Sequence, residues 1–153
     1  MANFMMLLGR WCLAVIFLMA GVNKFIDWNT TLGYMQAGMG NIMGLQLNPM
    51  MPVLLVAAAL LEILCALALI FGNRTRLAAG MLALFLIPTT LIFHNFWMVA
   101  PDQQQLQMMM FFKNLAIFGG LLVLLGAGPG RLSADAKRIR RYEDLVAEEE
   151  PTS

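Results

Sequence analysis

The sequence predicts an all-α integral membrane protein: a bundle of four membrane-spanning helices with both termini in the cytoplasm and an amphipathic C-terminal tail helix. Hydrophobic residues make up 60% of the 153 and charged residues 12%. A soluble domain has about 45–50% and about 25%. Four apolar runs are each close to the ~20 residues needed to cross a bilayer. The formal net charge of +1 gives no reason to expect a nucleic-acid partner.

The four predicted spans are Phe4–Ile26, Met51–Phe71, Leu77–Val99 and Met108–Ala127. Spans of this length must be helices, because backbone groups inside hydrocarbon have to be satisfied within the segment. Most of the ten Lys and Arg residues fall on one side, next to the first span's start, in the second connection and in the tail. The positive-inside rule then places both termini of this multi-pass protein in the cytoplasm.

The connections differ in length and composition. In the first, we expect a short helix from Asn29 to about Ala37, broken by Gly38 and Gly40. We expect Ala100–Gln107, "APDQQQLQ", to form a short polar loop on the outer side. These two segments flank the outer ends of the spans.

We expect the tail to be a second unit: residues 1–135 form the membrane domain, and residues 136–153 form a charged amphipathic segment in the cytoplasm. Pro129 and its neighbouring glycines end the fourth span, since proline cannot continue a helix. After it, Ala136, Ile139, Leu145 and Val146 fall on one helical face. We expect the first half to lie on the anionic leaflet and the closing "EEEPTS" to be disordered.

Polar residues near the outer ends of the spans predict an outward-facing polar pocket. Glu62, the only acid in a predicted span, is ten residues after Pro52, or ~15 Å deep at ~1.5 Å per residue. Four other polar residues lie near the outer ends of their spans: Lys24, His94, Lys113 and Asn114. An ionisable residue at such a depth indicates a functional site by default.

Helical spacing predicts that these residues face the bundle interior. Each shares a stripe with small residues, which let membrane helices approach closely. The stripes in the first and second spans are Arg10, Ala14, Phe17, Gly21 and Lys24, and Ala58, Glu62, Cys65, Ala66 and Leu69. Those in the third and fourth are Gly80, Ala83, Ile87, Thr90 and His94, and Lys113, Ala116, Gly120, Val123 and Ala127.

Several motifs in order resemble the DoxX family of small four-span bacterial inner-membrane proteins. They are "LLGRWCLAVIFLMAGVNKF" from Leu7, "LLEILCALALIFGNRTRLAA" from Leu60, "LIFHNFW" from Leu91 and "FFKNLAIFGGLLVLLGAGPGRLSAD" from Phe111. By this resemblance the family's recurrent positions include Arg10, Gly21, Lys24, Glu62, His94, Lys113, Asn114, Gly119, Gly120 and Gly128–Gly130. Some relatives are subunits of a thiosulfate:quinone oxidoreductase. Another is the membrane partner of a superoxide dismutase and a thiol sulfurtransferase. The resemblance implies redox or thiol-stress chemistry, with no single reaction.

The leading hypothesis assigns the chain to a redox-associated subunit that binds a quinone or a small sulfur compound. Glu62 and His94 are the candidate catalytic residues, exchanging protons. The candidate substrate-binding residues, which would hold an oxyanion or a carbonyl, are Arg10, Lys24, Lys113 and Asn114. Each has a structural alternative: pairing with Glu62, anchoring at an interface, or hydrogen bonding across helices. Whether the chain is an enzyme stays open; if it is, it is a quinone-linked oxidoreductase subunit rather than a complete enzyme.

Two other functions stay open. One is a non-catalytic scaffold or chaperone that assembles a redox complex. The other is a small-molecule or metal carrier, because Met35, Met39 and Met43 repeat at a spacing that suits Cu(I), although apolar packing explains the same residues. No intrinsic metal or cofactor is expected, and Cys12 and Cys65 are expected to pack as small apolar residues. Membrane lipid, other redox proteins or subunits, and a second copy of the chain are the expected partners.

Overall fold

The computed structural model describes residues 1–43 and 49–149, and within them every regular element is a helix. The helices are α1 (Ala2–Ile26), α2 (Trp28–Met43), α3 (Met51–Phe71), α4 (Thr75–Phe93), α5 (Pro101–Ala127) and α6 (Ala134–Glu149). Four of them, α1, α3, α4 and α5, are long and apolar enough to cross a membrane. The predicted all-α, four-span architecture is confirmed.

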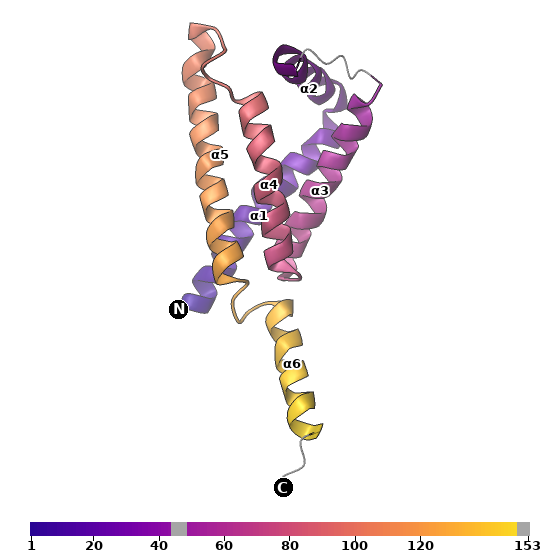
Figure 1. Cartoon of the computed structure of the whole chain (residues 1–153), viewed down its shortest axis with the longest axis vertical. Coiled ribbons are helices and arrows are strands. Elements are labelled where there is room, and N and C mark those ends of the chain that lie inside the picture. Colours follow the sequence, from indigo (N-terminus) through magenta and orange to yellow (C-terminus); the bar gives the residue numbers. More distant parts are fainter. Residues whose placement is uncertain (44–48, 150–153) are drawn as a thin grey trace.

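The four spans pack in the order α1, α3, α4, α5 (Figure 1). α1 lies along α3 and α5 along α4, while α1 and α5 touch only over a short stretch. α2 lies across one end of the spans and α6 extends away from the other (Figure 1). We call these the α2 end and the α6 end. The N-terminus and the start of α6 share the α6 end (Figure 1); which side of the membrane this end faces stays a prediction.

The core between the spans consists mainly of alanine and leucine. Ala14, Ala66, Leu82 and Leu121 are fully buried where the four spans meet. Large apolar side chains point outward along all four spans, as expected where the surrounding solvent is lipid. Close helix approach through small residues is the usual packing in membranes.

Close approach is tightest between α1 and α3. A Cβ atom added to Gly21 would lie 2.7 Å from Ile63 Cγ1 and 3.0 Å from the Ala59 carbonyl oxygen. A larger residue at this crossing would force the Ile63 side chain or the backbone of α3 to shift. The interior stripe predicted for the first span is confirmed, because the buried residues of α1 are Arg10, Ala14, Phe17 and Gly21.

The boundaries at the α2 end differ from the predicted ones. α4 ends at Phe93, not Val99, and α5 begins at Pro101, so the predicted loop over Ala100–Gln107 is wrong. Residues 101–107 form the first two turns of α5, and Ala100 is its N-cap. Pro101 suits the first turn of a helix, and Asp102 lies there too, where the helix dipole favours an acid. An apolar-run criterion misses such polar turns.

The predicted break in α2 at Gly38 and Gly40 is also wrong, because the helix continues to Met43. A Cβ atom added to Gly38 would lie 2.6 Å from two ring carbons of Phe93. Tertiary packing therefore requires a glycine at position 38, and the low helix propensity of glycine is overridden.

The interior face of α5 is rotated by about one residue from the predicted stripe. Asn114, Leu121 and Leu124 are buried, whereas Lys113 and Val123 are exposed. The tail also runs further as a helix than predicted, since α6 includes Glu149; the rest of "EEEPTS" lies outside the described residues. The proposed boundary between residues 135 and 136 stays a prediction.

Candidate functional site

An ion pair inside the spans joins α1 to α3. Lys24 Nζ lies 2.6 Å from Glu62 Oε2, with side-chain exposures of 20% and 5%. The ammonium also donates to the Ala20 carbonyl oxygen at 3.3 Å. Gly21 permits the approach, since a Cβ atom added to it would lie 3.3 Å from Glu62 Cβ. An unpaired charge is costly in this environment, so the pair stabilises both groups.

A pocket of about 210 Å³ lies beside the pair at the α2 end. α1, α2, α3 and α4 all contribute to its walls, through residues that include Lys24, Tyr34, Ala58, Phe85, Phe93 and His94. The Tyr34 and Phe93 rings stack with centroids 5.5 Å apart. The Tyr34 hydroxyl donates to the Phe93 carbonyl oxygen at 2.9 Å, which ties α2 to the end of α4. The pocket is therefore mostly apolar and aromatic, with polar groups at a few points.

His94 lines this pocket from the C-cap of α4. Its Nδ1 lies 2.9 Å from Gln107 Oε1 on α5. With the amide in this assigned orientation, Nδ1 carries the proton and Nε2 is left as an acceptor. The contact holds the imidazole in one orientation, which a group that transfers protons requires.

The other two candidates on the outer ends of the spans do not join this pocket. Lys113 is exposed, and its Nζ lies 3.2 Å from Met110 Sδ on the same helix. Asn114 is buried and donates to Thr90 Oγ1 at 3.0 Å, joining α5 to α4. Asn114 and Thr90 line a second cavity of about 220 Å³ between α4 and α5, and Lys113 lines neither cavity. The structure therefore does not bring the predicted polar residues together in a single network.

Arg10 lies at the opposite end of α1, at the α6 end. It is 14 residues from Lys24, or ~21 Å along the helix. Its side chain is 2% exposed, and Nη1 and Nη2 donate to the carbonyl oxygens of Pro129 and Leu132 at 2.7 and 3.0 Å. A Cβ atom on Gly72 would lie 2.8 Å from Nη1. Arg10 therefore holds the α5–α6 connection against the bundle.

The two cysteines, Cys12 and Cys65, form no disulfide. Cys12 is exposed, Cys65 is buried, and both thiols are free. Within residues 1–43 and 49–149, no three His, Cys, Asp or Glu side chains gather as a metal site of those ligands requires. Met35 lines the pocket, while the copper hypothesis for the methionine repeat stays untested.

The sequence alone does not predict three of the hydrogen bonds described above, which involve Gln107, Thr90 and Tyr34. Gln107 was assigned to a loop, and its bond to His94 depends on the early start of α5. Thr90 lay on a predicted interior stripe, but its bond to Asn114 required the true phase of α5. Tyr34 offered only its aromatic ring as a signal, and its position over Phe93 depends on the glycine contact in α2.

The fold and the site define a four-span membrane protein with a lysine–glutamate pair beside an aromatic pocket. The chain belongs to the DoxX family, whose family model matches residues 5–95. We conclude that it is a multi-pass inner-membrane protein.

Similar proteins cover most of the chain. The Escherichia coli inner membrane protein YphA is 29% identical over 133 residues, which are 87% of this chain and 89% of YphA. The E. coli inner membrane protein YqjF is 35% identical over 129 residues, 84% of this chain and 88% of YqjF. The yeast ER-derived vesicles protein ERV29 is 32% identical over 78 residues, but these are only 51% of this chain and 25% of ERV29. No solved structure matches the chain significantly.

Proposed function

We propose that this DoxX-family chain is a redox-associated membrane subunit that binds the headgroup of a quinone, or a similar carbonyl-bearing ligand, in the pocket at the α2 end. The single observation that carries the proposal is the Lys24–Glu62 pair at 2.6 Å beside an aromatic pocket. A lysine ammonium has three N–H donors. Two are used by Glu62 and Ala20, and the third is available to a ligand oxygen.

The pocket's size and walls support a ring-sized ligand. Its volume of about 210 Å³ is below the ~300–1,000 Å³ of sites that enclose a drug-sized molecule, so a headgroup fits and its tail extends into lipid. The stacked Tyr34 and Phe93 rings offer an aromatic wall. Offset or edge contacts with such rings favour another flat ring.

The polar groups have separable roles in this proposal. Lys24 donates to one ligand oxygen, and Glu62 holds the ammonium in place. His94, oriented by Gln107, serves as the second acid–base group. Reduction of a quinone to a quinol takes up two electrons and two protons. We assign the electrons to a partner redox protein. One proton comes from the Lys24 ammonium and the other from His94 after its Nε2 has taken up a proton from water, and Lys24 regains its proton from water.

The test measures quinone binding to the purified full-length chain in detergent. Lys24→Gln should weaken binding of a short-chain quinone at least about tenfold, the effect of losing one hydrogen bond to a charged group. Lys113→Gln is the matched control, since it removes the same charge from an exposed site outside the pocket. Equal affinities for the two variants would exclude the pocket as the binding site.

A second measurement separates binding from scaffolding. Glu62→Gln and His94→Ala are each compared with the parent chain for folded yield in membranes and for resistance of cells to thiol or oxidant stress. Normal yield with lost resistance supports a working site. Lost yield with no separate functional defect supports the scaffold function, in which the polar pairs only hold the helices together.

A further inference from the structure

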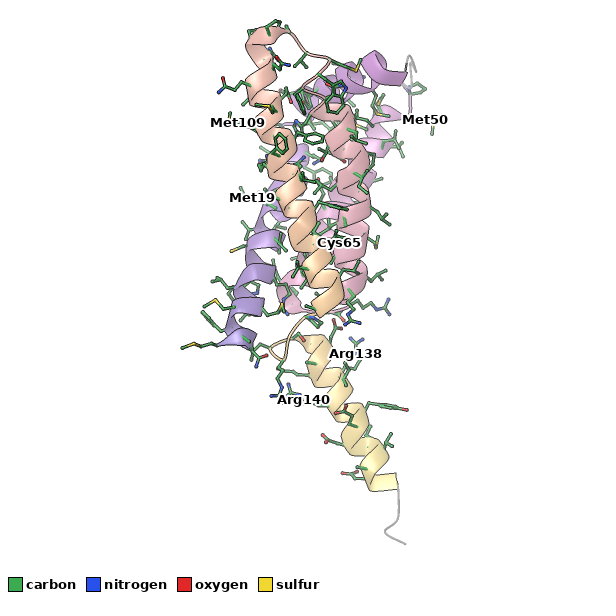
Figure 2. The ribbon with its side chains drawn as sticks, turned by 60° about the vertical axis from the view of Figure 1, so that its left-hand side comes forward. Met19, Met50, Cys65, Met109, Arg138 and Arg140 are labelled. Atoms are coloured by element: carbon green, nitrogen blue, oxygen red, sulfur yellow. The ribbon has the colours of Figure 1, made fainter. Side chains whose placement is uncertain are left out.

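A groove that combines arginines with apolar side chains lies at the α6 end, away from the pocket at the α2 end. It has a volume of about 620 Å³ and lies between the start of α4, the end of α5 and the first turns of α6. Arg74, Arg76 and Arg138 line it together with Leu77 and Ile139. Figure 2 labels Arg138 on the first turns of α6, below the ends of the spans.

The groove carries positive charge that the neighbouring acid does not cancel. Asp135 is the one acidic residue in its lining. Both carboxylate oxygens of Asp135 accept hydrogen bonds from backbone amides, Oδ1 from Arg74 and Oδ2 from Thr75, at 2.8 Å each. Asp135 therefore caps the start of α4 with both of its oxygens. Three guanidinium groups against one carboxylate leave an excess of positive charge in the groove.

Two of the arginines keep donors available. Arg76 Nη2 donates to the Gly126 carbonyl oxygen at 3.2 Å, and Arg138 Nη2 donates to Asn73 Oδ1 at 2.7 Å. These bonds fix the positions of both side chains. A guanidinium has five N–H donors, and each of these two uses one in the bond described. Both residues are exposed, so an incoming anion can reach them.

The groove lies at the ends of two of the spans. α4 begins at Thr75 and α5 ends at Ala127, so we expect the arginines to lie at the level of the lipid headgroups. Leu77 and Ile139 are 57% and 59% exposed, which places apolar surface next to the charges. A free inorganic anion would use the arginines alone, whereas a phospholipid would use both surfaces.

We propose that this groove binds the phosphate of an anionic phospholipid, with Arg76 and Arg138 donating to the phosphate oxygens and Leu77 contacting the acyl chains. Arginine suits this task because its planar donors match a phosphate in pairs. Basic pockets at the ends of membrane helices are a known form of lipid-headgroup site. The bound lipid would connect α4 to α6 and stabilise the position of the tail.

The test is native mass spectrometry of the full-length chain in detergent, titrated with phosphatidylglycerol. Arg76→Gln/Arg138→Gln should bind this lipid at least about tenfold more weakly, since each basic residue near an anionic lipid changes affinity about fivefold. Lys137→Gln/Arg141→Gln is the matched control: it removes the same charge from residues that do not line the groove. The control should weaken binding less than about threefold.

Three results would overturn the proposal. The first is an equal loss in both double variants, which indicates diffuse attraction to the basic tail. The second is equal binding of phosphatidylcholine, which shows that the lipid's net charge is not recognised. The third is displacement of the lipid by an equal concentration of inorganic phosphate, which assigns the site to a free anion.

The charge-conserving pair Arg76→Lys/Arg138→Lys keeps the test decisive if the glutamine pair does not fold. Loss of paired donors with retained charge should weaken phosphatidylglycerol binding about threefold or more. Unchanged binding in this pair would contradict the assignment of Arg76 and Arg138 as phosphate ligands.

Discussion

Arg10 and Lys24 lie on one stripe of α1, yet the structure gives them different tasks. Arg10 is 2% exposed and bonds to two backbone carbonyl oxygens of the α5–α6 connection. Lys24 is paired with a carboxylate and lines a pocket. Arg10 Nη1 and Nη2 donate to the protein's own backbone, whereas the lysine has a donor available beside a cavity. Two cations on one helix face can therefore serve structure and ligand binding separately.

The shape of the two cationic groups explains this division. The planar guanidinium reaches two carbonyl oxygens at once with fixed geometry, while the ammonium is a compact charge with three rotatable donors. Gly72, with φ of 67°, leaves the space in which the guanidinium lies. Gly21 leaves the space in which α1 and α3 bring Lys24 to Glu62.

Replacing Arg10 sharpens the comparison with the largest expected effect. Arg10→Ala should lower the free energy of unfolding by about 3–6 kcal/mol, since two charge-assisted bonds of about 1.5–3 kcal/mol each are lost. Arg10→Lys should recover only part of this, because one ammonium cannot reproduce the fork. Denaturant titration in mixed micelles measures both. Folded Arg10→Lys should bind quinone as tightly as the parent chain. A large change in its affinity would contradict the purely structural role of Arg10.

Breaking the ion pair should have the next largest effect on stability. Lys24→Met leaves Glu62 without its partner and should cost about 3 kcal/mol, as for other buried pairs that lose one member. Lys24→Met/Glu62→Gln should regain most of that stability, because a neutral amide is cheaper to bury. The double variant should still bind quinone weakly. Full recovery of both properties would show that the pair has no role in binding.

The smallest expected effect concerns Asp135 and pH. Burial alone would raise the pKa of the Asp135 carboxyl, but the hydrogen bonds from the backbone amides of Thr75 and Arg74 and the nearby Arg138 outweigh it, so the pKa is lowered. A pKa lower in the folded than in the unfolded chain means that the carboxylate stabilises the fold fully above about pH 4. This stabilisation is lost as the pH falls through the lowered pKa.

Asp135→Asn should therefore cost about 1 kcal/mol at neutral pH and flatten the loss of stability below about pH 4. Unfolding curves at a series of pH values check this. Asp144→Asn, on an exposed position of α6, is the control and should leave the acid limb of the profile unchanged. If Asp135→Asn and the parent chain lose stability equally at acid pH, Asp135 is not the cause of that loss.

The comparison of α1 with α5 shows why part of the site was predictable. In α1, small residues and cations repeat on one face, and that face is the buried one. In α5, glycines and alanines lie on more than one face, so the same rule selected Lys113 although Asn114 is the buried residue. Small residues mark possible contact faces, and the choice among them depends on the neighbouring helices.

The boundaries show the same limit at the α2 end. Hydropathy located α3 to the residue, because its apolar run and its helix coincide. It placed the start of α5 late, because the first two turns of α5 are polar and extend past the apolar run. The contact between His94 and Gln107 depends on those turns. No local pattern in the sequence joins a C-cap histidine to a glutamine in the next helix.

The sequence by itself determined the all-helical, four-span architecture and the stripe of α1, because an apolar solvent forces long helices and penalises any polar residue that does not face the interior. Only the tertiary structure decided which polar residues meet. It joined Lys24 to Glu62, His94 to Gln107 and Asn114 to Thr90, and it placed Arg10 on the α5–α6 connection. Pairing depends on helix order, phase and ångström-scale approach, and those are set by the packing of all the spans together.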